Sequence, residues 1–266
     1  MNILVTNDDG IYAPGLEALA KALRRLGEVQ IVAPLSEQSG VGHSITYLTP
    51  LLARRVMRDQ HPFGHAVAGS PADCVKLAVL ELCPQRPDLV VSGINSGSNA
   101  GIDVLYSGTV AAAIEGAFFG ITSCAVSHAV DTDPDYDQAA IRAVQIIEDL
   151  LHSPVPVGSL WNINLPDRRL WPPRGIKVLP ISVERSRDVM IRRTDPRGRA
   201  YYWSAVDDSE PLPLEPDTDL SGLAEGFITV TPLQFNLTHR PLMQAGREIA
   251  WRPLPPVSGE ESSRGG

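Results

Sequence analysis

The 266-residue chain lacks the sequence features of several common protein classes. Its three cysteines, Cys74, Cys83 and Cys124, stand far apart and form no Cys-x-x-Cys pair, so neither a zinc ribbon nor a disulfide framework is indicated. No apolar run approaches the ~18–20 residues that a membrane-spanning helix requires. The N-terminus also lacks a basic stretch followed by a cleavage site, so we expect a cytoplasmic protein with buried free thiols and no membrane partner.

An excess of positive charge is also missing, because the formal net charge is −8. This charge argues against binding of duplex nucleic acid, although a bound cation can still supply a local positive field for a small phosphate ester. No Gly-x-x-x-x-Gly-Lys-Ser/Thr loop occurs, which excludes P-loop nucleotide hydrolysis. Asn95 stands where a nucleophile elbow requires serine. Among the histidines we consider only His43 for catalysis, and favour a structural role for it.

Apolar periodicity over the first 155 residues predicts alternating strands and helices. Runs typical of buried strands alternate with stretches of helical spacing, such as Leu16, Leu19 and Leu23. The predicted strands are 2–6, 29–33, 88–93, 121–127, 160–165 and 176–181, and the predicted helices are 15–26, 71–82, 109–119 and 135–151. This order indicates an α/β fold whose core, over residues 1–182, is a Rossmann-like parallel sheet with helices on both faces, a three-layer arrangement.

The pattern changes after this core. Residues 183–240 are rich in charge, proline and β-forming residues, and runs at 199–205 and 227–233 predict arms of extended β-hairpins. A two-stranded arm is marginal in water on its own, so we predict that residues 183–252 form an oligomerisation arm of a homodimer or homotetramer. The alternative is that this segment folds back over its own core. The Pro-, Gly-, Ser- and Glu-rich end, 253–266, is predicted to be disordered.

Two adjacent carboxylates follow the first predicted strand. Ligands of open α/β sheets bind beyond the carboxyl ends of the strands, where Asn7, Asp8 and Asp9 stand. Mutual repulsion and partial desolvation make this pair costly unless a cation binds, and oxygen ligands suit Mg²⁺ or Mn²⁺. We therefore predict one divalent metal ion per subunit at this loop. The alternative is an Asx-rich turn that caps the next helix.

Two further loops bring small polar residues to the same predicted edge. After the second strand, Ser39 offers a hydroxyl and Gly40 lets the backbone approach a ligand. After the strand at 88–93, a glycine-rich loop runs on to residues 107–109, which open a helix whose free N–H groups and positive dipole end favour a phosphate. A flexible surface loop or an ordinary N-cap explains each feature alone. Their coincidence at one edge predicts a site for phosphate and metal.

Several stretches closely resemble motifs of the survival protein E (SurE) family. They lie at 7–15, 33–34, 38–40, 69–75, 92–97, 106–113, 162–166 and 227–233. The resemblance extends over about residues 1–240, and the joint occurrence of these motifs is highly specific to the family. The tail after residue 252 departs from the family pattern.

The resemblance implies 5′/3′-nucleotidase activity with acid phosphatase-like breadth, a Rossmann-like core and a C-terminal part that exchanges between subunits. It implies that the metal is held by Asp8, Asp9, Ser39 and Asn95. It also implies phosphate contacts near Ser107, Gly108 and Thr109, and we expect further contacts from Asn7, Gly40 and Asn95.

We therefore predict hydrolysis of nucleoside monophosphates. The metal would bind a phosphate oxygen and a water molecule and lower the pKa of that water. Asp8 would position or deprotonate the water, while Ser107 and the amides at 108–109 would hold the phosphate oxygens. Alternatively, Asp8 attacks phosphorus and forms an aspartyl phosphate. The non-enzymatic alternative is a nucleotide-binding or regulatory module, which the paired carboxylates disfavour because a pure anion site would not carry two negative charges.

Overall fold

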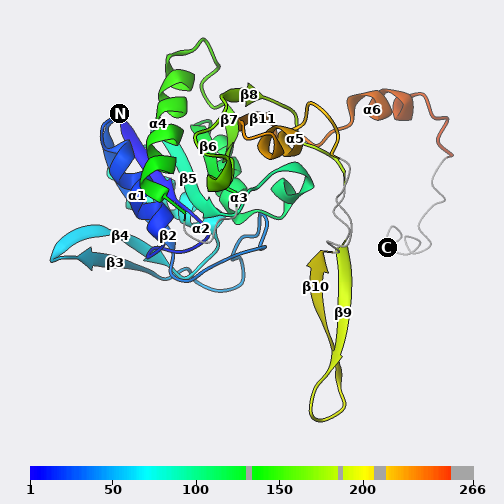
Figure 1. Ribbon diagram of the computed structural model, residues 1–266, viewed down its shortest axis with the longest axis horizontal. Helices are drawn as coiled ribbons and strands as arrows, with labels where there is room; N and C mark the ends of the chain where they lie inside the picture. Colours follow the sequence, from blue (N-terminus) through cyan, green and yellow to red (C-terminus); the bar gives the residue numbers. More distant parts are fainter. Residues whose placement is uncertain (130–133, 185–187, 207–213, 253–266) are drawn as a thin grey trace, which may run out of the picture. The chain divides into compact units, whose positions relative to one another are not determined.

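The structure is a computed structural model that describes residues 1–129, 134–184, 188–206 and 214–252 (Figure 1). Contacts divide the chain into two compact units, Met1–Leu233 and Gln234–Gly266. The first unit contains a nine-stranded sheet in the order β3-β4-β2-β1-β5-β6-β7-β11-β8, and a separate two-stranded sheet of β9 and β10. The predicted tail, 253–266, lies outside the described residues.

Parallel strands form the middle of the large sheet. They are β1 (Asn2–Thr6), β2 (Glu28–Pro34), β4 (His61–Val67), β5 (Leu89–Ser96), β6 (Thr122–His128) and β7 (Leu160–Leu165). Antiparallel neighbours flank them, because β3 (Ala53–Arg58) pairs with β4 and β11 (Ile228–Leu233) pairs with β7. The edge strand β8 (Ile176–Val178) runs parallel to β11.

Helices cover both faces of this sheet, which confirms the predicted three-layer α/β fold. On one face lie α1 (Pro14–Leu23) and α4 (Tyr136–His152), packed on Ile3 and Val5 of β1. The opposite face of β1 presents Leu4 to α2 (Pro71–Leu77) and α3 (Gly108–Phe118). The apolar run of β1 therefore reflects burial on both sides, as expected for a central parallel strand. The remaining helices are η1 (Ala78–Leu82), η2 (Gly101–Leu105), η3 (Arg168–Leu170), α5 (Asp219–Ala224) and α6 (Arg240–Arg247).

The prediction that residues 227–233 form a hairpin arm was wrong. Residues 227–233 are not a hairpin arm, because β11 inserts between β7 and β8 and its first four residues are buried. Burying these apolar side chains in the sheet is more favourable than leaving them exposed to solvent on a hairpin. The run at 199–205 does form a hairpin strand, β10 (Ala200–Val206), but its partner is β9 (Asp188–Thr194). The hairpin of β3 and β4 was not predicted.

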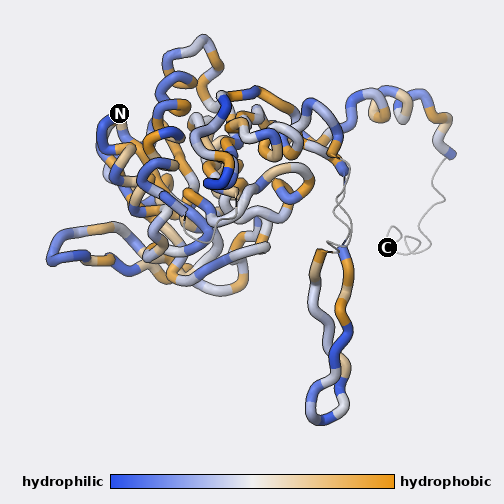
Figure 2. Tube along the Cα trace, in the orientation of Figure 1, coloured by the Kyte–Doolittle hydropathy of each residue, from blue (hydrophilic) through white to orange (hydrophobic). Residues whose placement is uncertain are grey.

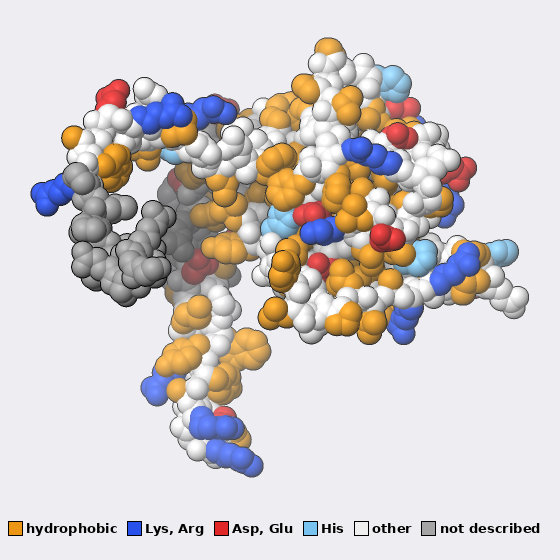
Figure 3. Space-filling view, turned by 180° about the vertical axis from the view of Figure 1, so that it is seen from behind, with side chains coloured by type: hydrophobic (Ala, Val, Ile, Leu, Met, Phe, Trp, Pro, Cys, Tyr) orange, Lys and Arg blue, Asp and Glu red, His pale blue; other side chains and the backbone are white. Residues whose placement is uncertain are grey.

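The β9–β10 hairpin exposes almost all of its side chains. Hydrophobic stretches run along its strands and hydrophilic residues occupy its tip (Figure 2). Large apolar side chains are visible on its surface in Figure 3. Its most exposed large apolar residues are Met190, Tyr202 and Trp203, each at least 60% exposed. Such a ribbon cannot bury its own apolar surface.

In the described part of the chain, no helix is both long and apolar enough to cross a membrane.

Candidate functional site

Backbone hydrogen bonds join the predicted polar loops at the carboxyl edge of the sheet. The N–H of Gln38, in the loop after β2, donates to the carbonyl of Asp8 at 2.8 Å. Further along the same loop, the N–H of Gly42 donates to the carbonyl of Tyr106, the residue before Ser107, at 2.9 Å. The loops after β1 and β2 and the loop that opens α3 therefore meet, as their places after parallel strands predicted.

Asp8 lies against the first turn of α3. Its side chain is buried, and its Oδ1 atom accepts a hydrogen bond from the hydroxyl of Thr109. Gly108 makes this close packing possible, because a Cβ atom there would lie 2.8 Å from the Asp8 Cβ and 3.0 Å from its Oδ2. A carboxylate at a helix N-terminus interacts favourably with the helix dipole. The sequence did not reveal this direct contact between the two motifs.

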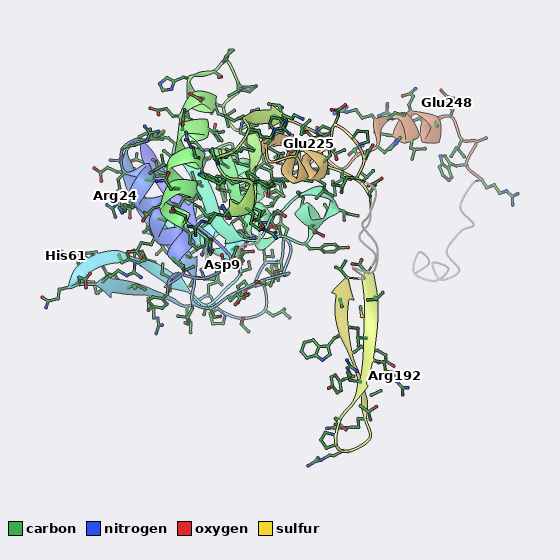
Figure 4. The ribbon with its side chains drawn as sticks, in the orientation of Figure 1. Asp9, Arg24, His61, Arg192, Glu225 and Glu248 are labelled. Atoms are coloured by element: carbon green, nitrogen blue, oxygen red, sulfur yellow. The ribbon has the colours of Figure 1, made fainter. Side chains whose placement is uncertain are left out.

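Asp9 reaches toward the end of β5, which carries Asn95. Its Oδ2 accepts a long hydrogen bond, 3.4 Å, from the N–H of Ser96, and Figure 4 labels Asp9 in the loop after β1. The register between β5 and β6 shifts just before Asn95, so Gly93 and Ile94 oppose a single residue of β6. Such irregularities re-aim side chains next to functional sites. The Asn95 Nδ2 atom donates to the carbonyl of Gly97 at 2.8 Å, which leaves its amide oxygen available as a ligand.

Burial makes both carboxylates difficult to ionise. It raises the pKa of Asp8, against the effect of the Thr109 hydrogen bond. Burial and the neighbouring charge of Asp8 raise the pKa of Asp9 to about 6. Glu37 adds to both shifts, and no sequence argument pointed to it. Repulsion between the charges of Asp8 and Asp9 favours the binding of a cation beside them.

The predicted ligand Ser39 is exposed beside these carboxylates. It follows Gln38, which is bonded to Asp8, and its hydroxyl donates to Glu37 Oε1 at 2.7 Å. The oxygen of Ser39 keeps lone pairs for a metal. Gly40 is also exposed, and nothing lies within 4 Å of where its Cβ would be. Gly40 therefore borders open space.

Three residues predicted to bind phosphate have side chains engaged in local structure. The amide of Asn7 is fully buried and bonds the backbone of Gly10 through both its oxygen and its nitrogen. Ser107 caps α3 by accepting a hydrogen bond from the N–H of Val110 at 3.1 Å. The buried hydroxyl of Thr109 donates to Asp8. The backbone amides at 107–109 are thus the stronger candidates for direct phosphate contact.

His43 packs against α3. Its Nε2 atom lies 2.9 Å from Glu115 Oε2, and its ring stacks on Phe118 with centroids 5.2 Å apart. These two contacts attach His43 to α3, and its structural role stays a prediction.

A buried polar cluster fixes the backbone between Asn95 and Ser107, and sequence reasoning missed its purpose. The N–H of Asn99 donates to Asn164 Oδ1 at 2.8 Å, and its carbonyl accepts from the side chains of Asn162 and Asn164. Two residues on, the N–H of Gly101 donates to Asp219 Oδ2 at 2.8 Å. The alternation of asparagines at 162 and 164 was the only signal in the sequence, since it places both on one face of a strand.

The donor set fits a hard divalent cation. Carboxylates from Asp8 and Asp9, the free amide oxygen of Asn95 and the hydroxyl of Ser39 are all oxygen ligands, as Mg²⁺ and Mn²⁺ prefer. Within the described residues, no three His, Cys, Asp or Glu side chains gather as metal ligands. The site would therefore combine the paired carboxylates with neutral oxygens.

Comparisons with known proteins agree on one family. The family model described as "Survival protein SurE" matches residues 3–188. A protein of Rhodopirellula baltica named "5′-nucleotidase SurE" is 51% identical over 254 residues, which cover 95% of this chain and all of that protein. A protein of the same name from Moorella thermoacetica is 46% identical, covering 90% of this chain and 92% of its own length. The crystal structure of the SurE protein from Aquifex aeolicus superimposes with a TM-score of 0.79 at 36% identity, covering 92% of this chain and 98% of that one.

Proposed function

The chain belongs to the survival protein SurE family, and from this membership and the geometry of the site we propose that it is a divalent-metal-dependent 5′-nucleotidase. Its substrates are nucleoside 5′-monophosphates and, with broader specificity, 3′-monophosphates, which it converts to nucleoside and phosphate. The observation that carries the proposal is the contact between Asp8 and the first turn of α3. The contact supports the proposal because it brings a carboxylate beside backbone amides that are suited to a phosphate.

Four side chains would hold the metal: Asp8, Asp9, Ser39 and Asn95. A bound Mg²⁺ or Mn²⁺ would neutralise phosphate charge and make a water molecule more acidic. The two carboxylates would supply negative charge where Asp8 is buried and Asp9 half-buried, and electrostatic interactions there are stronger than in water. Glu37, whose carboxylate accepts a hydrogen bond from the Ser39 hydroxyl, would add its negative charge nearby.

The remaining residues orient the reacting groups. Thr109 occupies Asp8 Oδ1 and leaves Oδ2 to face the first turn of α3, where Asp8 can accept a proton from water. The N–H groups at 107–109 bind the phosphate oxygens through their unpaired hydrogens. Asn7 holds the turn that presents both carboxylates. Ser107 would thus act mainly as the N-cap of α3, and Thr109 would act mainly to orient Asp8.

The role of Asp8 as proton acceptor has a rival in direct attack on phosphorus. In that mechanism an aspartyl phosphate forms and is then hydrolysed. Rapid acid quench with a labelled nucleotide distinguishes the two. We expect no label on the protein, and labelled Asp8 would replace the first mechanism by the second.

We further propose that two or four chains associate through the β9–β10 hairpin. Its exposed aromatic and aliphatic side chains, Met190, Tyr202 and Trp203 among them, are the kind of surface that a partner subunit covers. Exchange of an identical element is a low-cost route to a symmetric dimer. Light scattering on the full chain tests this, and a monomer at micromolar concentration would exclude it.

A substrate panel combined with a metal panel tests the proposed activity. Phosphate release is measured from AMP, 3′-AMP and ribose 5-phosphate with Mg²⁺, Mn²⁺ or Ca²⁺, and after chelation with EDTA. We expect release from AMP with Mg²⁺ or Mn²⁺, and loss of release after chelation that returns when metal is added. AMP binding without phosphate release under every metal would favour the alternative, a nucleotide-binding module.

A further inference from the structure

The buried carboxylate of Asp219 has no part in the metal or phosphate contacts described above, yet it binds the loop that joins them. Its side chain is 0% exposed and lies at the start of α5, more than a hundred residues after the loop. The Oδ2 atom accepts from the N–H of Gly101 at 2.8 Å, while Oδ1 accepts from the N–H groups of Ser182 and Leu220, each at 2.9 Å. A buried charge that costs much to desolvate is here held entirely by backbone amides.

The loop that Asp219 holds connects the two halves of the site. Asn95 precedes it and Ser107 ends it, with η2 between Gly101 and Leu105. Asn164 fixes the same loop at Asn99, through two hydrogen bonds of 2.8 and 3.1 Å. Two buried side chains therefore anchor two points of the backbone, from strand β7 and helix α5.

Packing at the second anchor leaves little room for adjustment. Gly101 has a φ of +60°, and a Cβ there would lie 3.0 Å from the side chain of Leu220. The N–H of Tyr106, at the far end of η2, donates to the carbonyl of Asp103 at 3.0 Å, so η2 is a closed turn between anchor and cap. A displacement at Gly101 is thus transmitted to Tyr106 and Ser107.

We propose that Asp219, with Asn164, is a positioning residue for the reaction: it sets the distance between the metal ligand Asn95 and the amides that open α3. This inference rests on the proposed nucleotidase activity. Its physical basis is that reacting groups must be held within a fraction of an ångström, and a misplacement of about 1 Å costs about 100-fold in rate. Asp219 acts through the loop and touches neither substrate nor metal.

The test compares Asp219→Asn and Asn164→Ala with Thr122→Val in the full-length protein. Asn at 219 keeps the volume but offers one acceptor oxygen where two are needed. Thr122 is a matched control, because its hydroxyl also accepts a glycine N–H, that of Gly158 at 3.1 Å, but at the amino end of β6. Each of the three variants loses at least one hydrogen bond between its side chain and the backbone, and only the first two lose it at the loop.

We expect kcat for AMP to fall about 10- to 100-fold in Asp219→Asn and Asn164→Ala, measured well below their melting temperatures. Hydrogen exchange should accelerate in residues 96–106 of these variants. Thr122→Val should lower the melting temperature and leave kcat and exchange in 96–106 unchanged. If either loop variant folds and keeps wild-type kcat, or if Thr122→Val loses kcat equally, the positioning role is overturned. A wild-type enzyme with no activity on AMP would instead overturn the proposed function.

Discussion

The carboxyl edge of the sheet and the β9–β10 hairpin use their residues in opposite ways. At the edge, polar side chains such as Asn7, Asp8 and Asp219 are buried and bonded to the protein itself. Along the hairpin, large apolar side chains such as Met190 and Trp203 are exposed. At the edge, the polar groups are desolvated but held in fixed positions by hydrogen bonds, whereas the hairpin leaves its apolar surface exposed to solvent. The chain thus contains the contacts that shape its candidate site, whereas the exposed apolar surface of the hairpin supports the proposed association with another chain.

This contrast predicts that substitutions at the edge change turnover in each chain, while substitutions on the hairpin change association. The largest effect on turnover should come from Asp8→Asn. The change removes a charge from a proposed metal ligand at nearly constant volume, so we expect kcat to fall about 1,000-fold or more with the fold retained. Phosphate release from AMP and circular dichroism measure the two properties.

Asp59→Asn is the matched control for this substitution. Asp59 lies in the turn between β3 and β4, close in sequence to His61, which Figure 4 labels, and its φ of 49° is a conformation that asparagine adopts readily. If Asp8→Asn keeps near-wild-type rates at saturating Mn²⁺, Asp8 is neither a metal ligand nor a catalytic residue.

Gly108→Ala should have the next largest effect. The new methyl group would lie 2.8 Å from the Asp8 Cβ and 3.1 Å from Pro71 Cγ, so either Asp8 or α3 must move. We expect a loss of about 100-fold in kcat/KM for AMP. Gly246→Ala in α6 is the control, because nothing lies within 4 Å of its added Cβ. Equal activity in the two variants would show that the packing of α3 on Asp8 is not needed for turnover.

Thr109→Val should lower kcat about 10-fold, because it removes the hydroxyl that orients Asp8 while keeping the side-chain volume. Thr109→Ser retains the hydroxyl and should recover most of the rate. Comparing the two variants distinguishes two roles for Thr109: orienting Asp8, and the direct phosphate contact expected from the sequence. A contact with phosphate would appear as a raised KM with unchanged kcat, contrary to our expectation.

Trp203→Lys should have the smallest effect on turnover and the clearest effect on assembly. Trp203 is 63% exposed on β10, and a charge there opposes burial in an interface. Light scattering should show at least about 10-fold weaker association, with kcat/KM per chain within a few-fold of wild type. Val157→Lys, also at an exposed apolar residue, should leave association unchanged. Association that survives Trp203→Lys would point to another interface.

Local patterns in the sequence were sufficient to predict the layers of the fold and the meeting of the polar loops at one edge of the sheet. Apolar runs identified β1 and β5, and helical spacing identified α1, α3 and α4, because each signal lies within one element. The parallel order then placed the loops at a common edge. The contacts between elements were beyond this reasoning, since the bond from Thr109 to Asp8 joins residues 101 positions apart.

The misplacement of residues 227–233 has a similar cause. Their alternation is compatible with an exposed hairpin and with a buried strand, and only pairing with Thr229 and its neighbours on both sides decides between them. Glu37 was missed because a single exposed carboxylate in a loop carries no pattern. The metal ligands and their roles remain predictions that the experiments above address.

The hydrogen bond from Gly101 to Asp219 has a consequence for biosynthesis. The two residues are separated by 118 positions, so a ribosome must add α5 before the loop between Asn95 and Ser107 acquires its second anchor. Strand β11, which pairs with β7, follows later still. Chains released early by premature termination before residue 219 would contain every proposed ligand and yet lack this anchor. The candidate site therefore matures near the end of translation, although Asp8 and Asp9 are among the first ten residues to emerge.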